Sequence, residues 1–196
     1  MLHIVYGGSA SGKSSYAESF VMSLQGDGRL LYIATMYPYK WNTTEIDPET
    51  MQRIERHRAM RADKGFDTVE CYRHVEHIVA KRQDVLLLEC MSNLLANEMY
   101  LGADGNAGSD MSGAQTLSPV SERIVRALVD LSTRVQELVI VTNDVFSDGG
   151  SLTYDESTRE YVKNLAEINC ALAREAETVT EVVCGIPVKI KGDKQP

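Results

Sequence analysis

The sequence predicts an α/β fold in which helices cover both faces of a mostly parallel sheet. Three observations support this prediction: apolar runs of strand length recur along the chain, helical segments separate them, and a glycine-rich turn joins the first run to the first helix. Strands that are apolar throughout are typical of sheets buried on both faces. Ligands of such sheets bind at the carboxyl ends of the strands, so we expect chemistry in the turns after Tyr6, Thr35, Glu89 and Asn143.

Strands and helices alternate in the first half of the chain. Apolar runs predict buried strands at 2–6, 30–35 and 84–90. Pro48 suits the first turn of a helix, and the residues after it, rich in Met, Arg, Ile and Glu, predict a helix over 48–64. The other elements expected here are helices at 13–24, 75–82 and 92–101 and a short strand at 67–71.

The second half begins with a small, polar, glycine-rich segment at 102–118, which predicts a surface loop that is either mobile or a lid. A second loop is expected at 146–154. Around these loops we expect helices at 119–135 and 155–177, a strand at 137–143 and closing strands within 178–191. The sequence shows no internal repeat and no linker, so residues 1–196 are expected to form a single domain.

The net charge of −8 argues against general affinity for nucleic acid or anionic membranes, so any phosphate-binding surface must be a local concentration of positive charge. No apolar run approaches the roughly 20 residues that cross a bilayer. The N-terminal residues do not have the pattern of a secretory signal. We therefore expect a cytoplasmic protein without a membrane span.

The four cysteines, Cys71, Cys90, Cys170 and Cys184, form no C-x-x-C pair, and three of them lie in or beside apolar runs. This pattern predicts reduced, mostly buried thiols. A zinc site would need clustered Cys and His ligands, which this spacing does not offer.

The glycine-rich turn matches the phosphate-binding pattern G-x-x-x-x-G-K-[ST] and has a strand before it and a helix after it. In such a loop the backbone N–H groups surround phosphate oxygens, and the helix N-terminus adds positive charge. Lys13 would reach the β- and γ-phosphates and Ser14 would ligate Mg²⁺. The alternative is a glycine-rich turn with a chance Lys-Ser pair. The loop consists of Gly7, Gly8, Ser9, Ala10, Ser11, Gly12, Lys13 and Ser14.

A loop of this kind needs an acidic residue at the end of a nearby strand. Glu89 follows four apolar residues and is the main candidate, as a second Mg²⁺-associated residue, and Asp144 is a weaker one. An ordinary charged residue at a strand end is the alternative for both. The guanine motif N-K-x-D is absent, and no D-x-x-G follows the strand at 84–90. This favours a transferase over a nucleotide-dependent switch.

Four arginines surround one histidine in the segment RIERHRAMR at 53–61. On a helix Arg53, His57 and Arg61 share one face, where guanidinium groups would suit a triphosphate. Nearby positive charge favours a neutral imidazole, which is a competent nucleophile toward an α-phosphate. Spacing alone nevertheless favours a solvated helix face with a lone surface histidine. The other histidines, His3, His74 and His77, are assigned no role.

These residues together resemble the bifunctional adenosylcobinamide kinase/adenosylcobinamide-phosphate guanylyltransferase family of cobalamin biosynthesis. The resemblance extends from Ile4 to Lys191. The ordered pair of RIERHR at 53–58 and VCGIPVKIK at 183–191 is more specific than the phosphate loop, which many enzymes share. The other matching segments are GGSASGKSSYAE, LYIAT, TVE, LLLEC, VTNDV and INCALA.

The resemblance implies two reactions on a recA-like, phosphate-loop fold. ATP or GTP phosphorylates adenosylcobinamide, and GTP then transfers GMP through a covalent intermediate on His57 to give adenosylcobinamide-GDP. It also implies Mg²⁺, a homo-oligomer, typically a trimer, and nucleotide contacts beyond the loop at Thr35, Met36, Tyr37, Arg61, Ala62, Glu70 and Glu89.

The chain departs from the family pattern at three places. Ala10 stands where an arginine is usual, Phe66 stands where a tryptophan is usual, and the segment NDVFSDGGSLT at 143–153 stands where N-E-V-G followed by G-I-V-P is usual. These changes affect the expected substrate contacts and leave His57 and the phosphate loop intact. The alternative function is a phosphate-loop kinase for another small alcohol, without a histidine intermediate. A non-enzymatic nucleotide-binding module is a third possibility, which the missing guanine and switch motifs make weaker.

Overall fold

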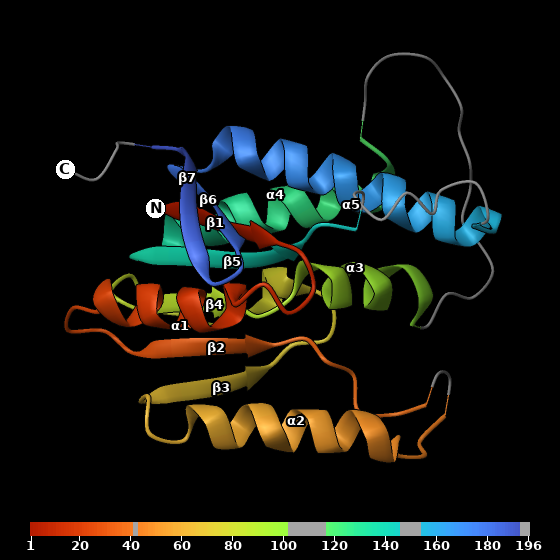
Figure 1. The fold of residues 1–196 in the computed structure, drawn as a ribbon, viewed down its shortest axis with the longest axis horizontal. Coiled ribbons are helices and arrows are strands. Elements are labelled where there is room, and N and C mark those ends of the chain that lie inside the picture. Colours follow the sequence, from red (N-terminus) through yellow and green to blue (C-terminus); the bar gives the residue numbers. More distant parts are fainter. Residues whose placement is uncertain (41–42, 102–116, 146–153, 193–196) are drawn as a thin grey trace.

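The computed structural model describes residues 1–40, 43–101, 117–145 and 154–192, and their strands form one seven-stranded sheet (Figure 1). The strand order is β3-β2-β4-β5-β1-β6-β7. Neighbouring strands are parallel except β6 and β7, which form an antiparallel pair at one edge. The strands are β1 Leu2–Gly7, β2 Leu30–Ala34, β3 Phe66–Glu70, β4 Val85–Leu88, β5 Glu137–Asn143, β6 Thr178–Val183 and β7 Ile186–Lys191. The predicted α/β fold with a mostly parallel sheet is thus confirmed.

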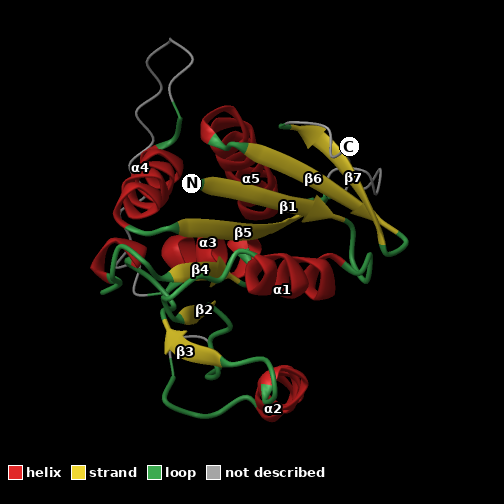
Figure 2. Ribbon diagram, turned by 90° about the vertical axis from the view of Figure 1, so that its left-hand side faces the viewer, coloured by secondary structure: helices red, strands yellow, loops and turns green. Residues whose placement is uncertain are grey.

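Helices lie on both faces of the sheet (Figures 1 and 2). Three of them, α3, α4 and α5, share the larger apolar cluster on one face, and α1 packs into a smaller cluster on the other. The remaining helix, α2, lies beside the edge strand β3 (Figure 1). The helices are α1 Lys13–Ser23, α2 Pro48–Arg61, α3 Met91–Tyr100, α4 Pro119–Arg134 and α5 Glu156–Glu175.

The strand β2 shows why continuous apolar runs produce this layered fold. Side chains alternate between the two faces of a strand, so Leu31 and Ile33 join the cluster under α3, α4 and α5, while Leu30 and Tyr32 join the cluster under α1. All four are buried. Because both faces of the strand are covered, a polar side chain at any of these positions would be desolvated at a cost in free energy. The run is therefore apolar throughout.

Helix α2 differs from the other helices because its sequence has no wide apolar stripe. Pro48 occupies its first turn as predicted, but the helix ends at Arg61 rather than at residue 64, shortly before the left-handed Gly65. Arg61 is its only buried residue. The rest of this basic helix is exposed or half-buried, so its charged side chains are available at the edge of the sheet.

The predicted helix over 75–82 is wrong. This segment contains only a short 3₁₀ helix, Val75–His77, and the chain is already extended at Ile78. Val75 and Ile78 are buried in the larger apolar cluster, which includes residues of α4, whereas Val79 is 87% exposed. Val75 and Ile78 are three residues apart, a spacing that is compatible with a single helical turn as well as with a long helix. The apolar spacing alone therefore does not predict the length of the helix.

The prediction of mostly buried thiols is also wrong. All four cysteines are free, but Cys170 and Cys184 are exposed and Cys71 and Cys90 are half-buried. Cys170 lies on the outer surface of α5, and Cys184 lies in the β6–β7 turn with a φ of 50°. An apolar neighbour in sequence does not bury a residue whose own side chain points away from the core.

The two predicted loops fall almost wholly outside the described residues, namely at 102–116 and 146–153. Within the part of the chain that is described, no helix has the length and apolarity needed to cross a membrane.

Candidate active site

The glycine loop, residues 7–14, connects the carboxyl end of β1 to the start of α1. Gly12 precedes the helix in the left-handed conformation, with a φ of 90°, which favours glycine. A Cβ on Gly7 would lie 2.7 Å from both Ser11 Oγ and the Val182 carbonyl oxygen, so this position is closed to larger residues. No side chain caps α1 and its first turn holds no acidic residue, which leaves its N–H groups available to an anion.

Lys13 is buried in this loop with 9% of its surface exposed. Its Nζ donates to the Gly8 carbonyl oxygen at 2.9 Å. Burial lowers the pKa of Lys13, against a weaker opposing effect of Cys90. Among the described residues it forms no ion pair, so an anion bound by the loop would supply the missing counter-charge.

Glu89 follows β4 and holds the turn after β2 in place. Its Oε1 accepts hydrogen bonds from the backbone N–H groups of Thr35 and Met36, both at 3.1 Å, and its Oε2 accepts one from the Tyr32 hydroxyl at 2.7 Å. Burial, with the charge of Glu89 and this hydrogen bond, raises the pKa of Tyr32. The carboxylate therefore joins the ends of two neighbouring strands.

Arg61 lies with its guanidinium carbon 3.4 Å from the centre of the Tyr32 ring. Arg61 is 6% exposed, and its Nε and Nη1 are buried without a hydrogen-bond partner among the described residues. Stacking on an aromatic ring stabilises a guanidinium but does not satisfy its N–H groups. These two donors are therefore free to bind an anion.

A cavity of about 340 Å³ opens beside the glycine loop, and we call it the glycine-loop cavity. Lys13 and Ser14 line it from the loop, Arg53 and His57 line it from α2, and Glu89 lies between them. The histidine and the lysine thus face the same space, although 44 positions separate them in the sequence. The other lining residues are Ser9, Tyr32, Met36, Cys90, Asn93, Val141, Asn143, Asp144 and Val145.

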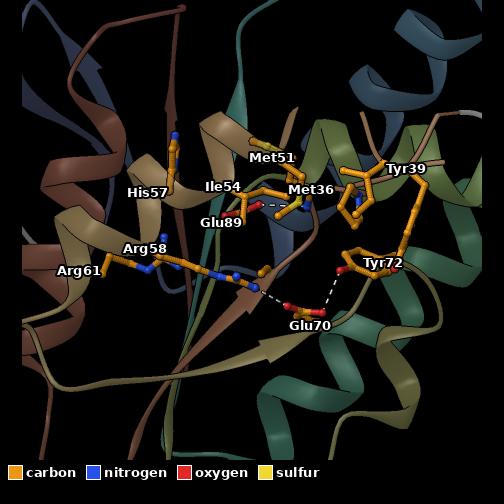
Figure 3. A pocket seen from close by; sticks show the side chains of 13 residues that line it. Met36, Tyr39, Met51, Ile54, His57, Arg58, Arg61, Glu70, Tyr72 and Glu89 are labelled. Carbon is orange, nitrogen blue, oxygen red and sulfur yellow. Dashed lines mark hydrogen bonds and ion pairs between the residues drawn. The ribbon is translucent and has the colours of Figure 1, made fainter. Parts of the chain in front are cut away.

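A second cavity of about 200 Å³, the arginine cavity, is also lined by His57 (Figure 3). Arg58 and Arg61 line it, and Met36, His57 and Glu89 line both cavities. Glu70 accepts hydrogen bonds from Arg58 Nη2 at 2.5 Å and from the Tyr72 hydroxyl at 2.9 Å. His57 therefore lines two cavities that each contain basic side chains as well as carboxylates.

Comparison of the sequence with protein-family models identifies the family of this chain. The family model described as cobinamide kinase/cobinamide phosphate guanyltransferase matches residues 3–190. The chain belongs to this family. The resemblance stated from the sequence segments is therefore confirmed.

Individual relatives support the same family. The bifunctional adenosylcobalamin biosynthesis protein CobU of Escherichia coli is 30% identical over 197 residues, covering 97% of this chain and all of the relative. The protein of the same name from Salmonella typhimurium is 29% identical, again over 97% of this chain and all of its own length. CobP of Pseudomonas aeruginosa is 26% identical over 98% of this chain and 99% of its own.

Eight of the sixteen site residues predicted from the sequence and from the family resemblance line these two cavities. Met36, His57 and Glu89 are shared, and Arg61 and Glu70 line the arginine cavity. Tyr37 lines a larger neighbouring cavity. Asp144, the weaker candidate, lines the glycine-loop cavity, and its N–H donates to the Gly7 carbonyl oxygen at 3.0 Å.

Three predicted site residues, Thr35, Ala62 and Ala10, line neither of the two cavities. Thr35 is fully buried: its hydroxyl donates to the Cys90 carbonyl oxygen at 3.1 Å, and its own carbonyl accepts from Asn97 at 2.7 Å. Ala62 is exposed at the end of α2 and lines neither cavity. Ala10, where the cobinamide kinase family usually has arginine, is exposed with a φ of 55°.

Sequence reasoning missed several residues that line the site. Asn93 and Asn143 line the glycine-loop cavity, and Asn143 donates to the Ser92 hydroxyl at 2.7 Å. Tyr32 lines this cavity from inside a strand, and Tyr72 lines the arginine cavity. Asn143 could have been found from its place at the carboxyl end of an apolar strand. Tyr32 could not, because its position inside an apolar run is typical of a core residue.

The residues present fit a magnesium ion that is held mainly by phosphate oxygens, which is the usual way nucleotides carry it. Ser14 and Glu89 line the same cavity. Three hydrogen bonds already reach the carboxylate of Glu89, which leaves about one of its four lone pairs, so contact through a water molecule suits it better than direct ligation. No group of three or more His, Cys, Asp or Glu residues able to hold a metal occurs in the described part of the chain.

Proposed function

We propose that this protein phosphorylates adenosylcobinamide with ATP or GTP and then transfers GMP from GTP through His57 to give adenosylcobinamide-GDP. The observation that carries the proposal is that His57 and Lys13 line one cavity. Membership of the cobinamide kinase/cobinamide phosphate guanyltransferase family supports both reactions. The names of the relatives, bifunctional adenosylcobalamin biosynthesis proteins, support the same pathway.

In the nucleotidyl transfer, a ring nitrogen of His57 attacks the α-phosphorus of GTP. A phosphorus–nitrogen bond forms, the bond from the α-phosphorus to the bridging oxygen breaks, and diphosphate leaves with the electron pair. An oxygen of adenosylcobinamide phosphate then attacks the same phosphorus and releases the imidazole. This second displacement forms the diphosphate linkage of the product and regenerates the free histidine.

Positive groups in the two cavities would stabilise the charge that builds up on the phosphates. We expect Lys13 and the N-terminus of α1 to contact the β- and γ-phosphates, and Arg53 lines the same cavity from α2. Arg61 offers unpartnered donors on the other side of His57. Because Lys13 and Arg61 are buried, their attraction to a phosphate is screened less than it would be at the surface.

The phosphorylation uses the glycine loop and no covalent intermediate. The loop and Lys13 would orient the γ-phosphate, and the substrate hydroxyl attacks it while the terminal bridging oxygen leaves with the nucleoside diphosphate. Ser14, with Glu89 through water, would hold Mg²⁺, which when bound offsets negative charge on the phosphates.

The decisive test is incubation with Mg²⁺ and GTP labelled at the α-phosphate. Wild-type protein is expected to retain one acid-labile label per chain, because phosphorus–nitrogen bonds to histidine hydrolyse in acid. The variant His57→Asn should retain none. Arg56→Asn is the matched control, since Arg56 is an exposed neighbour on the same helix and should label like wild type.

Label at the γ-position of GTP separates the covalent intermediate from tightly bound nucleotide, because only α-label should survive denaturation. A folded wild-type protein that takes up no label would refute the histidine step. The alternative kinase predicts a different pattern, in which Lys13→Ala abolishes phosphate transfer to an alcohol while His57→Asn leaves every activity of the protein unchanged.

The assembly and location of the protein belong to the same proposal. The family resemblance suggests a homo-oligomer, typically of three chains, and the need for nucleoside triphosphates suggests the cytoplasm. No role in binding nucleic acid is proposed, in line with the net charge of −8.

A further inference from the structure

A third cavity lies at the same carboxyl edge of the sheet, and we call it the outer cavity. The chain after β2 and the chain after β3 form most of it, and Leu101 at the end of α3 completes it. Its volume is about 1280 Å³, compared with about 340 Å³ for the glycine-loop cavity and about 200 Å³ for the arginine cavity. Neither smaller cavity has room for a macrocycle.

The three cavities form a continuous series. Glu70 and Tyr72 line both the outer cavity and the arginine cavity. His57 and Met36 in turn line both the arginine cavity and the glycine-loop cavity. Figure 3 shows the middle part of this series, with His57 on one side of the arginine cavity and Tyr72 on the other. A molecule in the outer cavity could thus extend an arm toward His57.

The lining of the outer cavity combines aromatic and apolar surface with polar side chains. The ring centres of Tyr37 and Tyr72 lie 5.4 Å apart in an edge-to-face arrangement. Val79 borders the cavity with 87% of its surface exposed, so it offers apolar surface that a ligand could cover. The rings of His74 and His77 stack with centres 5.7 Å apart and add hydrogen-bonding groups.

The wall that carries His74 is held in a strained backbone conformation. His74 has a φ of 58°, which is uncommon for a residue other than glycine. Its N–H donates to Glu98 Oε1 at 2.7 Å, and Glu98 is itself bound by Arg123 at 2.9 Å. Burial alone would raise the pKa of Glu98, but these hydrogen bonds lower it, so the carboxylate stays charged and keeps this wall in place.

We propose that the outer cavity binds the corrin macrocycle of cobinamide, with the hydroxyl or phosphate arm passing through the arginine cavity to His57. This inference rests on the proposed function, from which it takes the substrate. A corrin ring has apolar faces and a rim of amides, which match the aromatic and apolar walls and the polar side chains described above. The arrangement separates the macrocycle from the nucleotide and lets only the arm reach the reactive phosphorus.

The test uses Val79→Arg, which adds bulk and charge to an exposed position of the outer cavity without disturbing the core. The KM for adenosylcobinamide phosphate in GMP transfer is expected to rise at least about tenfold, equivalent to about 1.4 kcal/mol. The rate of His57 labelling by GTP, which needs no corrinoid, should stay within about twofold of wild type. Met22→Arg on α1, at a half-exposed position remote from all three cavities, is the matched control.

Direct binding gives a second measurement that does not depend on catalysis. Cobinamide absorbs visible and near-ultraviolet light, so it should quench the fluorescence of Trp41, the single tryptophan of the sequence. Tyr37→Ala and Val79→Arg should each raise the Kd for cobinamide at least about tenfold.

Unchanged KM and Kd in both variants would overturn the outer cavity as the corrinoid site, while normal labelling of His57 would leave the proposed function standing. If wild-type protein takes up no label, yet both variants still lose cobinamide binding, the site is supported and the histidine step fails instead.

Discussion

At the scale of single residues, Arg61 gives the clearest indication of an anion. Its guanidinium is buried on Tyr32, and two of its nitrogens have no partner among the described residues. Burying unsatisfied charged donors normally costs several kcal/mol of stability. Such an arrangement is understandable if a phosphate completes it, and the loss of the guanidinium should then affect binding more than folding.

We predict that Arg61→Met raises the KM for GTP in His57 labelling about 10- to 100-fold, because hydrogen bonds to charged groups contribute about 1.5–3 kcal/mol. The melting temperature should stay equal or rise, since methionine can cover Tyr32 without a buried charge. Arg56→Met, at an exposed position on the same helix, should change neither quantity. An unchanged KM together with a lower melting temperature would show that Arg61 has only a structural role.

Spacing placed Arg53, His57 and Arg61 on one face of a helix, and the described α2 carries all three toward the two cavities. It could not show which arginine is buried, because burial depends on Tyr32 in a strand about thirty positions earlier. The three hydrogen bonds to Glu89 were equally invisible, since they depend on the turn after β2.

At the scale of elements, Asp84 joins the starts of β2 and β4. Its carboxylate accepts hydrogen bonds from the Arg29 guanidinium at 2.6 Å, from the Arg29 N–H at 3.2 Å and from the Lys81 N–H at 2.8 Å. Burial alone would raise the pKa of Asp84, but these hydrogen bonds outweigh it and lower the pKa to about 2.

The folded-state pKa of Asp84 lies below the ordinary value of about 3.9, so the unfolded chain binds the proton more tightly. The stabilisation is therefore fully present above about pH 5 and is lost as the pH falls toward 2. We predict that Asp84→Asn lowers the free energy of unfolding by about 2 kcal/mol at pH 7 and by much less at pH 2.5. Urea unfolding at both pH values measures this, and Asp63→Asn, at an exposed position, serves as the control.

Equal losses of unfolding free energy for Asp84→Asn at both pH values would contradict this coupling between the pKa of Asp84 and stability.

The helices and strands were not all equally predictable from the sequence. The strands at 2–6, 84–90 and 137–143 were clear because they are apolar throughout, and Pro48 marked the start of α2. The segment 75–82 was misjudged because Val75 and Ile78 are buried by α4, a contact that local spacing does not contain.

At the scale of the whole molecule, β7 forms an unpaired edge of the sheet. Every residue of this strand is exposed, including Ile186 at 65% and Ile190 at 62%. Ile186, Val188 and Ile190 alternate along the strand and present one exposed apolar face, which suits contact with another chain, whereas Pro and Lys at the positions between them disfavour pairing along the strand edge itself. This agrees with the proposed homo-oligomer. The expectation of three chains comes from the family resemblance and not from this strand.

We predict that sedimentation equilibrium gives a mass that is a multiple of 21.7 kDa and that the double variant Ile186→Lys/Ile190→Lys lowers it. Met60→Lys, at a position 56% exposed on α2, should leave the mass unchanged. A wild-type mass of one chain would refute the oligomer. A mass that the double variant does not change would place the interface away from β7.

The hydrogen bond from the Gly185 N–H to the Ser11 carbonyl oxygen, 2.8 Å long, has a consequence for the order in which the protein is made. The glycine loop is synthesised before its supporting turn, because 174 positions separate Ser11 from Gly185. β1 likewise lies between β5 and β6 among the described strands, so its first neighbour is complete only at residue 143 and its second only at residue 183. The nascent chain therefore carries an unfinished glycine loop until residue 185 has been synthesised, and we expect GTP to protect the growing polypeptide from proteolysis only after that point.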